Sequence, residues 1–380
     1  MKKNKKGYEI ILFIALFLVA CASAAQQKSN VANVSEKIKT LEIHVINVGQ
    51  GDCFLLISPS GKKVLIDAGN TGKGVGFVLP YLRNLGITSV DYIVASHYHS
   101  DHIGGLDEVI NGLGGNSHIV YAAFDRGGNY NSGAFRDYIK AIGDKRKTIS
   151  PDQTMNFGDD ATMKCIASDG YIPTGRAYSG TDENTLSVVF ILKFHSFDMY
   201  LGGDCNIAIE SSLAPFAGDV DIYKVSHHGS ATSSTQQLLD CLKPEVSVIT
   251  VGNGNAYGHP NSGTLSRLLN MNSYIYQTEP GSAIPPVGKG EVANGNFTII
   301  TDGDSYTISG ASLVSKTRLT DLNLALLNKI ESCLRYWPFL YFSRPRVDVA
   351  GSEANRDGMN FDTEIITWIW KLPSPVWACR

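Results

Sequence analysis

The chain has 380 residues, of which 43% are hydrophobic and 18% are charged. This is the composition of a globular protein, and it excludes a disordered chain, a collagen-like chain and a polytopic membrane protein. The 33 basic and 36 acidic residues give a net charge of −3, so the sequence lacks the basic character of a dedicated nucleic-acid-binding protein.

The first residues predict an export signal over residues 1–24. Four lysines precede an uninterrupted apolar run at residues 10–20, which is short for a membrane span but suits a signal peptide better than an uncleaved anchor helix. Leu18 to Cys21 resemble a bacterial lipobox, which would leave Cys21 as a lipidated first residue and a membrane anchor. Residues 22–24 instead resemble the cleavage site of a freely secreted protein. We therefore expect a cell-envelope lipoprotein or a secreted protein.

A polar stretch follows the signal, and residues 25–39 are expected to form a tether. Removal of residues 1–24 would take away four lysines and one glutamate and leave a net charge of −6. This acidic balance argues against a chain that grips nucleic acid by electrostatic attraction along its whole length.

From residue 41 the chain alternates between short strand-like runs and amphipathic runs. Polar clusters follow several of the strand-like runs, which suits a site along one shared edge of two sheets packed between helices. We expect strands at 41–48, 53–59, 62–69, 90–97, 186–194, 198–204, 219–228, 245–252, 273–279 and 295–303, and helices at 74–86, 102–114, 233–242 and 263–272.

The pattern ends after about residue 315, and we assign residues 313–380 to a C-terminal extension. All four tryptophans lie at Trp337 or beyond it. One amphipathic helix fits residues 317–337, and the remainder has no clear period. The extension is either a docking segment for a partner or an added segment without a packed structure of its own.

The strongest chemical signal is a cluster of four side chains at the end of an expected strand. His97, His99, Asp101 and His102 lie within six residues. Alternate residues of a turn project to one side, so the first two histidines can bind one metal ion while Asp101 and His102 turn toward a second ion. A surface cluster of histidines is the alternative, but the apolar strand before the cluster and the two glycines after it disfavour that interpretation.

This cluster is the HxHxDH signature, and the chain resembles the metallo-β-lactamase superfamily. The resemblance implies an α/β fold, namely an αββα sandwich with two mixed sheets between outer helices. It also implies that Asp67 holds the metal loop without binding metal and that Asp204 bridges two ions. The last ligand would then be His227 or His228.

The resemblance narrows to the hydrolase domain of ComEC-type competence proteins and their secreted relatives. The sequences VGQGDC, HHGS, YGHP and YQTEPG match that branch in order, and the similarity runs from about residue 41 to residue 310. We accordingly expect a hydrolase domain over residues 40–312, in which Asp52 of the first sequence supports the metal ligands from behind.

The chain differs from many superfamily members in one ligand of the first ion. Those members carry a third histidine before the bridging aspartate. This chain has no histidine in that window, as in the ComEC-type branch, and His195 is expected to be a solvated turn residue. Asn184 or Asp182 would then fill the gap beside the first ion, or water and substrate would occupy it.

The HHGS sequence leaves the last ligand open. Neighbouring residues at a strand end point in opposite directions, so only one of His227 and His228 should face the metal, and the other would contact phosphate or support the ligands. His259 is either a contact for the substrate or its leaving group, or an ordinary turn residue, in a loop fixed by the flanking glycine and proline.

These residues predict a hydrolase that holds two divalent ions, Zn or Mn. A hydroxide bridging the ions would be the nucleophile, with Asp101, Asn184 and His259 in catalytic roles. We expect an exported phosphodiesterase or nuclease acting on a small anionic substrate or a phosphodiester, DNA included, and the sequence predicts no particular protein partner. The alternatives are a hydrolase of a lactone, a choline-phosphate ester or, least favoured, a β-lactam, and a lipoprotein that binds metal without catalysis.

Overall fold

The computed structural model describes residues 39–309 and 314–316. All described residues belong to one compact unit. The predicted signal peptide, Cys21, the tether up to residue 38 and all but residues 314–316 of the predicted extension lie outside the described residues. No helix among the described residues has both the length and the apolar character that a membrane span requires.

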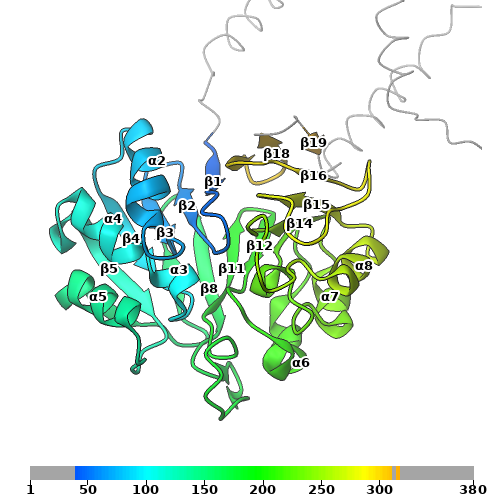
Figure 1. Cartoon of the computed structure of the whole chain (residues 1–380), viewed down its shortest axis with the longest axis horizontal. Coiled ribbons are helices and arrows are strands. Elements are labelled where there is room, and N and C mark those ends of the chain that lie inside the picture. The colour runs from blue at the N-terminus through cyan, green and yellow to red at the C-terminus, as the bar shows by residue number, and fades with distance from the viewer. Residues whose placement is uncertain (1–38, 310–313, 317–380) are drawn as a thin grey trace, which may run out of the picture. The chain divides into compact units, whose positions relative to one another are not determined.

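Two large sheets form the centre of the described unit (Figure 1). The first sheet has the strand order β19-β18-β17-β1-β2-β3-β4-β5-β6. Its strands are β1 (Leu41–Val45), β2 (Phe54–Ile57), β3 (Lys63–Ile66), β4 (Val90–Val94), β5 (Ile119–Asp125), β6 (Arg146–Thr148), β17 (Phe297–Thr301), β18 (Tyr306–Ser309) and β19 (Val314–Lys316). Strand β19 pairs with β18 and so continues the sheet beyond residue 312.

The second sheet has the order β16-β15-β14-β13-β12-β11-β8-β7. Its strands are β7 (Thr154–Asn156), β8 (Thr162–Ala167), β11 (Val189–Phe194), β12 (Phe197–Leu201), β13 (Ile222–Lys224), β14 (Val246–Ile249), β15 (Tyr274–Gln277) and β16 (Gly290–Val292). A small separate ribbon joins β9 (Tyr171–Ile172) to β10 (Gly175–Arg176). Both large sheets contain a parallel part, β3 to β6 in the first and β12 to β16 in the second.

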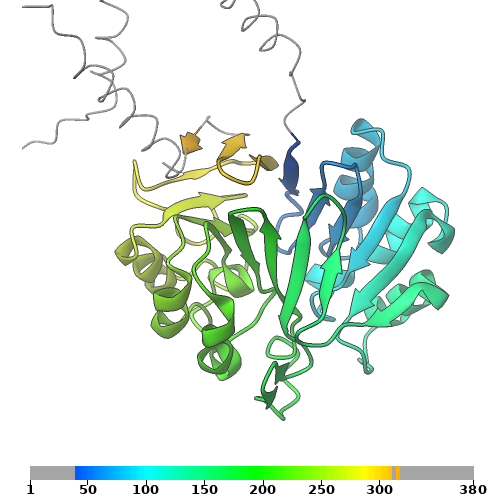
Figure 2. The ribbon, with the colours of Figure 1, turned by 180° about the vertical axis from the view of Figure 1, so that it is seen from behind.

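Helices cover the outer face of each sheet, as the two opposite views make plain (Figures 1 and 2). The first sheet carries η1 (Gly74–Val78), α2 (Leu79–Asn84), α3 (Ser100–Ile103), α4 (Leu106–Leu113) and α5 (Gly133–Ile142). The second sheet carries α6 (Ile207–Ala217), α7 (Gln236–Leu242) and α8 (Ser262–Asn270). Single turns η2 (Asn116–His118), η3 (Gly143–Lys145) and η4 (Ser226–Gly229) complete the described elements.

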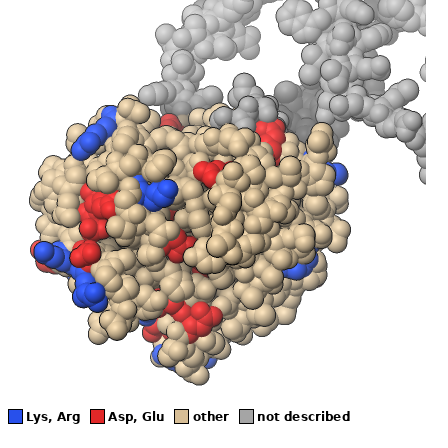
Figure 3. Space-filling view, viewed as in Figure 1, with Lys and Arg blue, Asp and Glu red and all other residues tan. Residues whose placement is uncertain are grey.

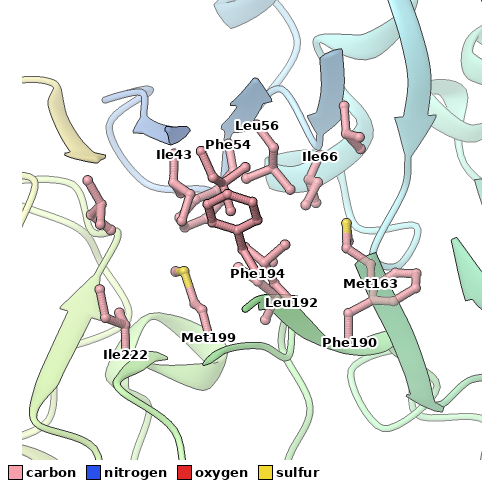
Figure 4. Close-up of a cluster of buried hydrophobic side chains, with 14 of the residues drawn as sticks. Ile43, Phe54, Leu56, Ile66, Met163, Phe190, Leu192, Phe194, Met199 and Ile222 are labelled. Atoms are coloured by element: carbon pink, nitrogen blue, oxygen red, sulfur yellow. The ribbon is translucent and has the colours of Figure 1, made fainter. Parts of the chain in front are cut away.

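The core follows from alternation along the strands, whose successive side chains point to opposite faces. In β2, Phe54 and Leu56 pack between the two sheets, whereas Leu55 packs among the helices of its own sheet. The same alternation separates Phe190 from Ile191 in β11. Side chains from both sheets therefore meet in one buried layer (Figure 4). The predicted αββα sandwich is confirmed.

The expected elements are largely present, with two corrections. The predicted helix 102–114 is two helices, α3 and α4, because the chain bends at Gly105, where an added Cβ would lie 2.3 Å from the carbonyl oxygen of Ala68. The predicted strand 219–228 was wrong in its second half, because β13 ends at Lys224 and the HHGS segment turns sharply in η4. The predicted hairpin is present as β11 and β12, with His195 exposed in its turn.

Candidate metal centre

The predicted ligands and the predicted support residue Asp67 follow strands of both sheets at their carboxyl ends. Asp67 comes directly after β3, and His97 comes shortly after β4 in the first sheet. In the second sheet, Asp204 follows β12 and the HHGS segment follows β13. Because parallel strands of one sheet end at the same edge, the two sheets bring these loops together in one crevice.

One group of metal-binding atoms, called the second ligand group below, comes from Asp101, His102, Asp204 and His228. Their ligand atoms all lie within 4.8 Å of one another. Nε2 of His102 is 3.2 Å from Oδ1 of Asp204, and Nε2 of His228 is 3.4 Å from Oδ2 of Asp101. The short helix α3 carries both Asp101 and His102, which explains why these neighbours in the sequence serve the same group.

The other group, called the first ligand group below, comprises His97, His99 and Asp204, again with ligand atoms within 4.8 Å. Nε2 of His97 is 3.1 Å from Nδ1 of His99 and 3.8 Å from Oδ2 of Asp204. Asp204 thus presents Oδ1 to one group and Oδ2 to the other. Its carboxylate is the one shared element of the two groups, as expected of a bridging residue.

The hydrogen bonds of His102 and His228 suit their ligand group to a cation. Nδ1 of His102 donates to Asp67 at 2.8 Å and Nδ1 of His228 donates to the Thr250 carbonyl at 2.8 Å, because both partners are acceptors. In the neutral form that would bind a metal, each ring then presents the lone pair of Nε2 toward the Asp204 carboxylate. Lone pairs that converge without a proton between them are stabilised by a divalent ion, and mixed nitrogen and oxygen donors suit Zn or Mn.

The pKa shifts of the pocket also indicate a site that suits a cation. Burial alone would raise the pKa of Asp204, yet neighbouring histidines, His228 and His102 foremost, outweigh burial and hold that pKa well below its usual value. Burial alone would lower the pKa of His102, but the carboxylates around it raise that pKa well above its usual value. The buried carboxylates therefore stabilise positive charge at this point of the fold.

Asp67 lies where the sequence predicts a support for the metal loop. Its carboxylate accepts from the Ser96 amide at 2.8 Å and from the Ser96 hydroxyl at 2.6 Å, besides His102. It therefore fixes the residue before His97 and the ring of His102 together. Asp67 is not part of either metal-binding group that contains Asp204.

Asp52 lies behind the second ligand group, as the sequence predicts. Its partners Lys224 and Thr250 were not predicted. Its carboxylate is 2.6 Å from Nζ of Lys224, which is 1% exposed, and it accepts from the hydroxyl of Thr250. Lys224 also donates to the Gly203 carbonyl at 3.0 Å, directly before Asp204. Asp52, Asp67 and His102 are close enough to hold an ion of their own, but the Lys224 ammonium supplies a positive charge there.

The two consecutive histidines differ from the sequence expectation. His227 and His228 both have φ near 52°, a left-handed conformation, so they do not alternate as they would in a strand. Both side chains consequently line the same cavity of about 310 Å³. The lining residues of this cavity are Gln50, His99, Ser100, Asp101, Asn184, Asp204, His227, His228, Tyr257 and His259. The expectation that the two histidines point in opposite directions was wrong.

The remaining candidates divide between the cavity and its surroundings. Asn184 lines the cavity, and its buried Oδ1 has no hydrogen-bond partner among the described residues. Asp182 instead accepts from Asn206 at 2.7 Å and from Thr185 at 3.0 Å, so its carboxylate is hydrogen-bonded outside the cavity. His259 is in the cavity wall, its ring centre 5.2 Å from that of His227.

His259 has the properties of a neutral imidazole. Its Nδ1 is buried without a hydrogen-bond partner in the described part of the chain. Burial and the neighbouring His228 and His227 lower the pKa of His259 to about 4. An uncharged ring with a free polar atom next to the ligand groups can donate to or accept from a bound molecule.

Comparison with protein families identifies the chain. The family model described as the metallo-beta-lactamase superfamily matches residues 46–252. The chain belongs to this superfamily. The matched region contains every residue of the two metal-binding groups, and a metallo-β-lactamase-type enzyme with these groups is a metal-dependent hydrolase.

Curated relatives confirm the predicted resemblance to competence proteins. The chain is 26% identical over 245 residues to Recombination protein 2 of Haemophilus influenzae, covering 63% of this chain and 28% of the relative. It is 23% identical over 286 residues to ComE operon protein 3 of Bacillus subtilis, covering 70% and 35%. The chain therefore matches about a third of the length of these relatives.

Solved structures show similarity at lower sequence identity. A diphosphatase from the PhnP family aligns over 69% of this chain and 98% of its own, with 13% identity and a TM-score of 0.38.

Proposed function

We propose that this metallo-β-lactamase-type hydrolase is an exported phosphodiesterase or nuclease with two divalent ions, Zn or Mn. The observation that carries the proposal is the shared carboxylate of Asp204 between two ligand groups at the wall of an open cavity. Two ions bound there would lower the pKa of a water molecule toward neutrality and neutralise charge on a phosphoryl oxygen. A phosphodiester needs both effects, since it is anionic and reacts slowly with water.

The proposed ligands of the first ion are His97, His99 and Asp204. Asn184 would complete this set, because its unpartnered Oδ1 lies in the cavity wall and amide oxygens bind divalent ions. The proposed ligands of the second ion are Asp101, His102, Asp204 and His228.

His227 and His259 are proposed to act on the substrate. Both have a buried Nδ1 without a partner among the described residues, and both line the cavity. Burial lowers the pKa of His227, so its ring, like that of His259, is uncharged near neutral pH. These rings can orient the phosphoryl group and pass a proton to the departing alkoxide.

We expect single substitutions to separate the two neighbouring histidines. His228→Ala should remove one of two bound ions, because His228 belongs to a ligand group and His227 does not. His227→Ala should keep both ions and lower kcat by about 10²-fold, the effect of losing one acid–base group. Metal content by mass spectrometry and kcat measured on the same samples check this, and loss of an ion in His227→Ala alone would reverse the assignment.

A phosphodiester is favoured over other substrates for two reasons. One relative is named as a recombination protein and another, from Neisseria gonorrhoeae, as a competence protein, and both names concern DNA. On the face shown in Figure 3, lysines and arginines are scattered among acidic groups and form no continuous basic track. Without such a track on this face, the ions would supply the main attraction for an anion there, which suits a short or single-stranded phosphodiester better than a long duplex.

A panel of substrates tests the proposed function. The metal-loaded protein should hydrolyse bis-p-nitrophenyl phosphate and single-stranded DNA, and His99→Ala should reduce both rates by about 10²-fold or more. A lactone, a choline-phosphate ester and nitrocefin serve as the competing substrates. Turnover of one of these without turnover of the phosphodiesters would contradict the proposal, and equal turnover in His99→Ala would contradict the use of metal ions.

Export rests on the sequence of residues 1–24, with Cys21 as the proposed lipidation site and membrane anchor. Replacement of Cys21 by serine should release the protein from the membrane fraction if lipidation anchors it.

A further inference from the structure

The two ligand groups differ in how their histidines are oriented. In the second group, His102 donates to a carboxylate and His228 donates to a backbone carbonyl, each at 2.8 Å. In the first group, Nδ1 of His97 is 3.2 Å from the Ser96 hydroxyl, and within the described part of the chain no carboxylate except that of Asp204 lies within 4.0 Å of a nitrogen of either ring. Partners of this kind fix the orientation of ligands, so the first group needs support from another source.

That support comes through the backbone of Tyr98, the residue between the two histidines. The Tyr98 amide donates to Oε1 of Glu183 at 2.9 Å, and Glu183 is 4% exposed. Arg126 binds the same carboxylate at both oxygens, at 2.8 Å from Nε and 2.7 Å from Nη2. The guanidinium also lies over the Tyr98 ring, with Cζ 4.3 Å from the ring centre.

Arg126 and Glu183 therefore enclose Tyr98 from two sides. The Tyr98 hydroxyl is fixed as well, because it donates to the Gly127 carbonyl at 2.7 Å. A hydrogen bond between backbone groups also joins the segments of Glu183 and Tyr98: the Val188 amide donates to the Ser96 carbonyl at 2.7 Å. The segment 183–188 thus runs beside the metal loop and holds it at the residues that flank His97.

We infer that Arg126 and Glu183 form a buried pair that positions the ligands of the first metal ion. The pair holds the loop from His97 to His99 in the geometry that binds the ion. The inference rests on the proposed binding of an ion by His97, His99 and Asp204. Glu183 lies in the window that carries a third histidine ligand in many superfamily members. In this chain the window instead supplies a carboxylate to the loop amide and, at the next position, Asn184 to the cavity wall.

The pair is a positioning device and not a ligand. Glu183 is not among the cavity-lining residues, and both of its oxygens are engaged by Arg126. Arg126 makes a further ion pair with Asp169 at 2.9 Å, so its charge is retained at this place when Glu183 changes. This makes Glu183→Gln the milder test, since it keeps the size of the side chain and one acceptor oxygen.

The test is metal titration of the full chain without substrate. Metal-free Glu183→Gln, titrated with Mn²⁺ in a calorimeter, should show one binding step weakened by about 10- to 100-fold and the other unchanged. The weakened step should be the one missing in His99→Ala. Arg126→Lys keeps the charge but loses the two-point contact, so it should weaken the same step and replaces Glu183→Gln if that variant does not fold.

The matched control is Glu210→Gln. Glu210 is also a buried glutamate that accepts backbone amides, from Ser234 and Thr235 at 2.7 Å each, and it belongs to neither ligand group. Glu210→Gln should leave both binding steps unchanged. Wild-type affinities in Glu183→Gln, equal weakening of both steps, or the same selective loss in Glu210→Gln would overturn the inference. Because no step of the titration requires turnover, failure of the phosphodiesterase assay would leave this result intact.

Discussion

Replacement of Asp204 by asparagine is expected to reduce kcat/KM for any hydrolysed phosphodiester by about 10³-fold or more. The Asp204 carboxylate reaches one ligand group through Oδ1 and the other through Oδ2. Asparagine keeps the size of the side chain but loses the charge and replaces one oxygen by a donor that repels a cation. Both ions should therefore bind more weakly, and steady-state kinetics with metal analysis of the same samples measure the two effects together.

Asp198→Asn is the matched control for this substitution. Asp198 lies on β12, the strand that leads to Asp204, and its side chain pairs with Lys193 on the surface at 2.7 Å. Loss of this exposed ion pair should leave kcat/KM and metal content unchanged. Full metal content with wild-type turnover in Asp204→Asn would contradict a bridging carboxylate.

Lys224→Met is expected to have the largest effect on stability. Lys224 is 1% exposed and its Nζ lies 2.6 Å from Asp52, which is itself 2% exposed. Removal of one partner leaves a buried charge without its counterion, which typically costs about 3–5 kcal/mol. Urea unfolding of the metal-free protein should report a loss of this size.

A double substitution separates the ion pair from the fold around it. Asp52→Asn combined with Lys224→Met removes both charges, and it should recover a large part of the stability lost in Lys224→Met. Lys193→Met, which breaks the exposed pair with Asp198, should change the free energy of unfolding by less than about 1 kcal/mol. A loss in Lys224→Met no larger than in Lys193→Met would show that the buried pair contributes little.

Local patterns in the sequence predicted two sheets packed between helices and the HxHxDH cluster, whereas Asp204 and the histidines of the HHGS segment came from the resemblance to the superfamily. The alternation in residues 53–59 and 186–194 is a direct consequence of strands with two buried faces, and β2 and β11 lie there. The HxHxDH cluster is short, so one strand end and one turn of helix determine where its four side chains lie.

The left-handed turn at the HHGS segment could not be predicted from the local sequence. Residues other than glycine seldom have positive φ, as His227 and His228 do, and the preceding strand pattern favours continued extension. Only the packed loop, in which an added Cβ at Gly229 would lie 2.7 Å from Pro260, shows that the strand must end earlier. The same turn explains why both histidines reach one cavity.

Contacts between residues far apart in the sequence could not be predicted either. Asp52 and Lys224 meet across the two sheets, and Arg126, Glu183 and Tyr98 come from three separate loops. No spacing in the sequence links these residues. One signal was present, since Lys224 interrupts an apolar run and a lysine at such a position is expected to be paired when the run is buried.

The central claim is that two ions bind on either side of Asp204, and anomalous X-ray diffraction tests it most directly. Crystals of the full chain grown with Mn²⁺ or Zn²⁺ and measured at the absorption edge of the metal should give two peaks. We expect one peak bounded by His97, His99 and Asp204, and the other by Asp101, His102, Asp204 and His228. A single peak, or peaks that do not contact Asp204, would contradict the account.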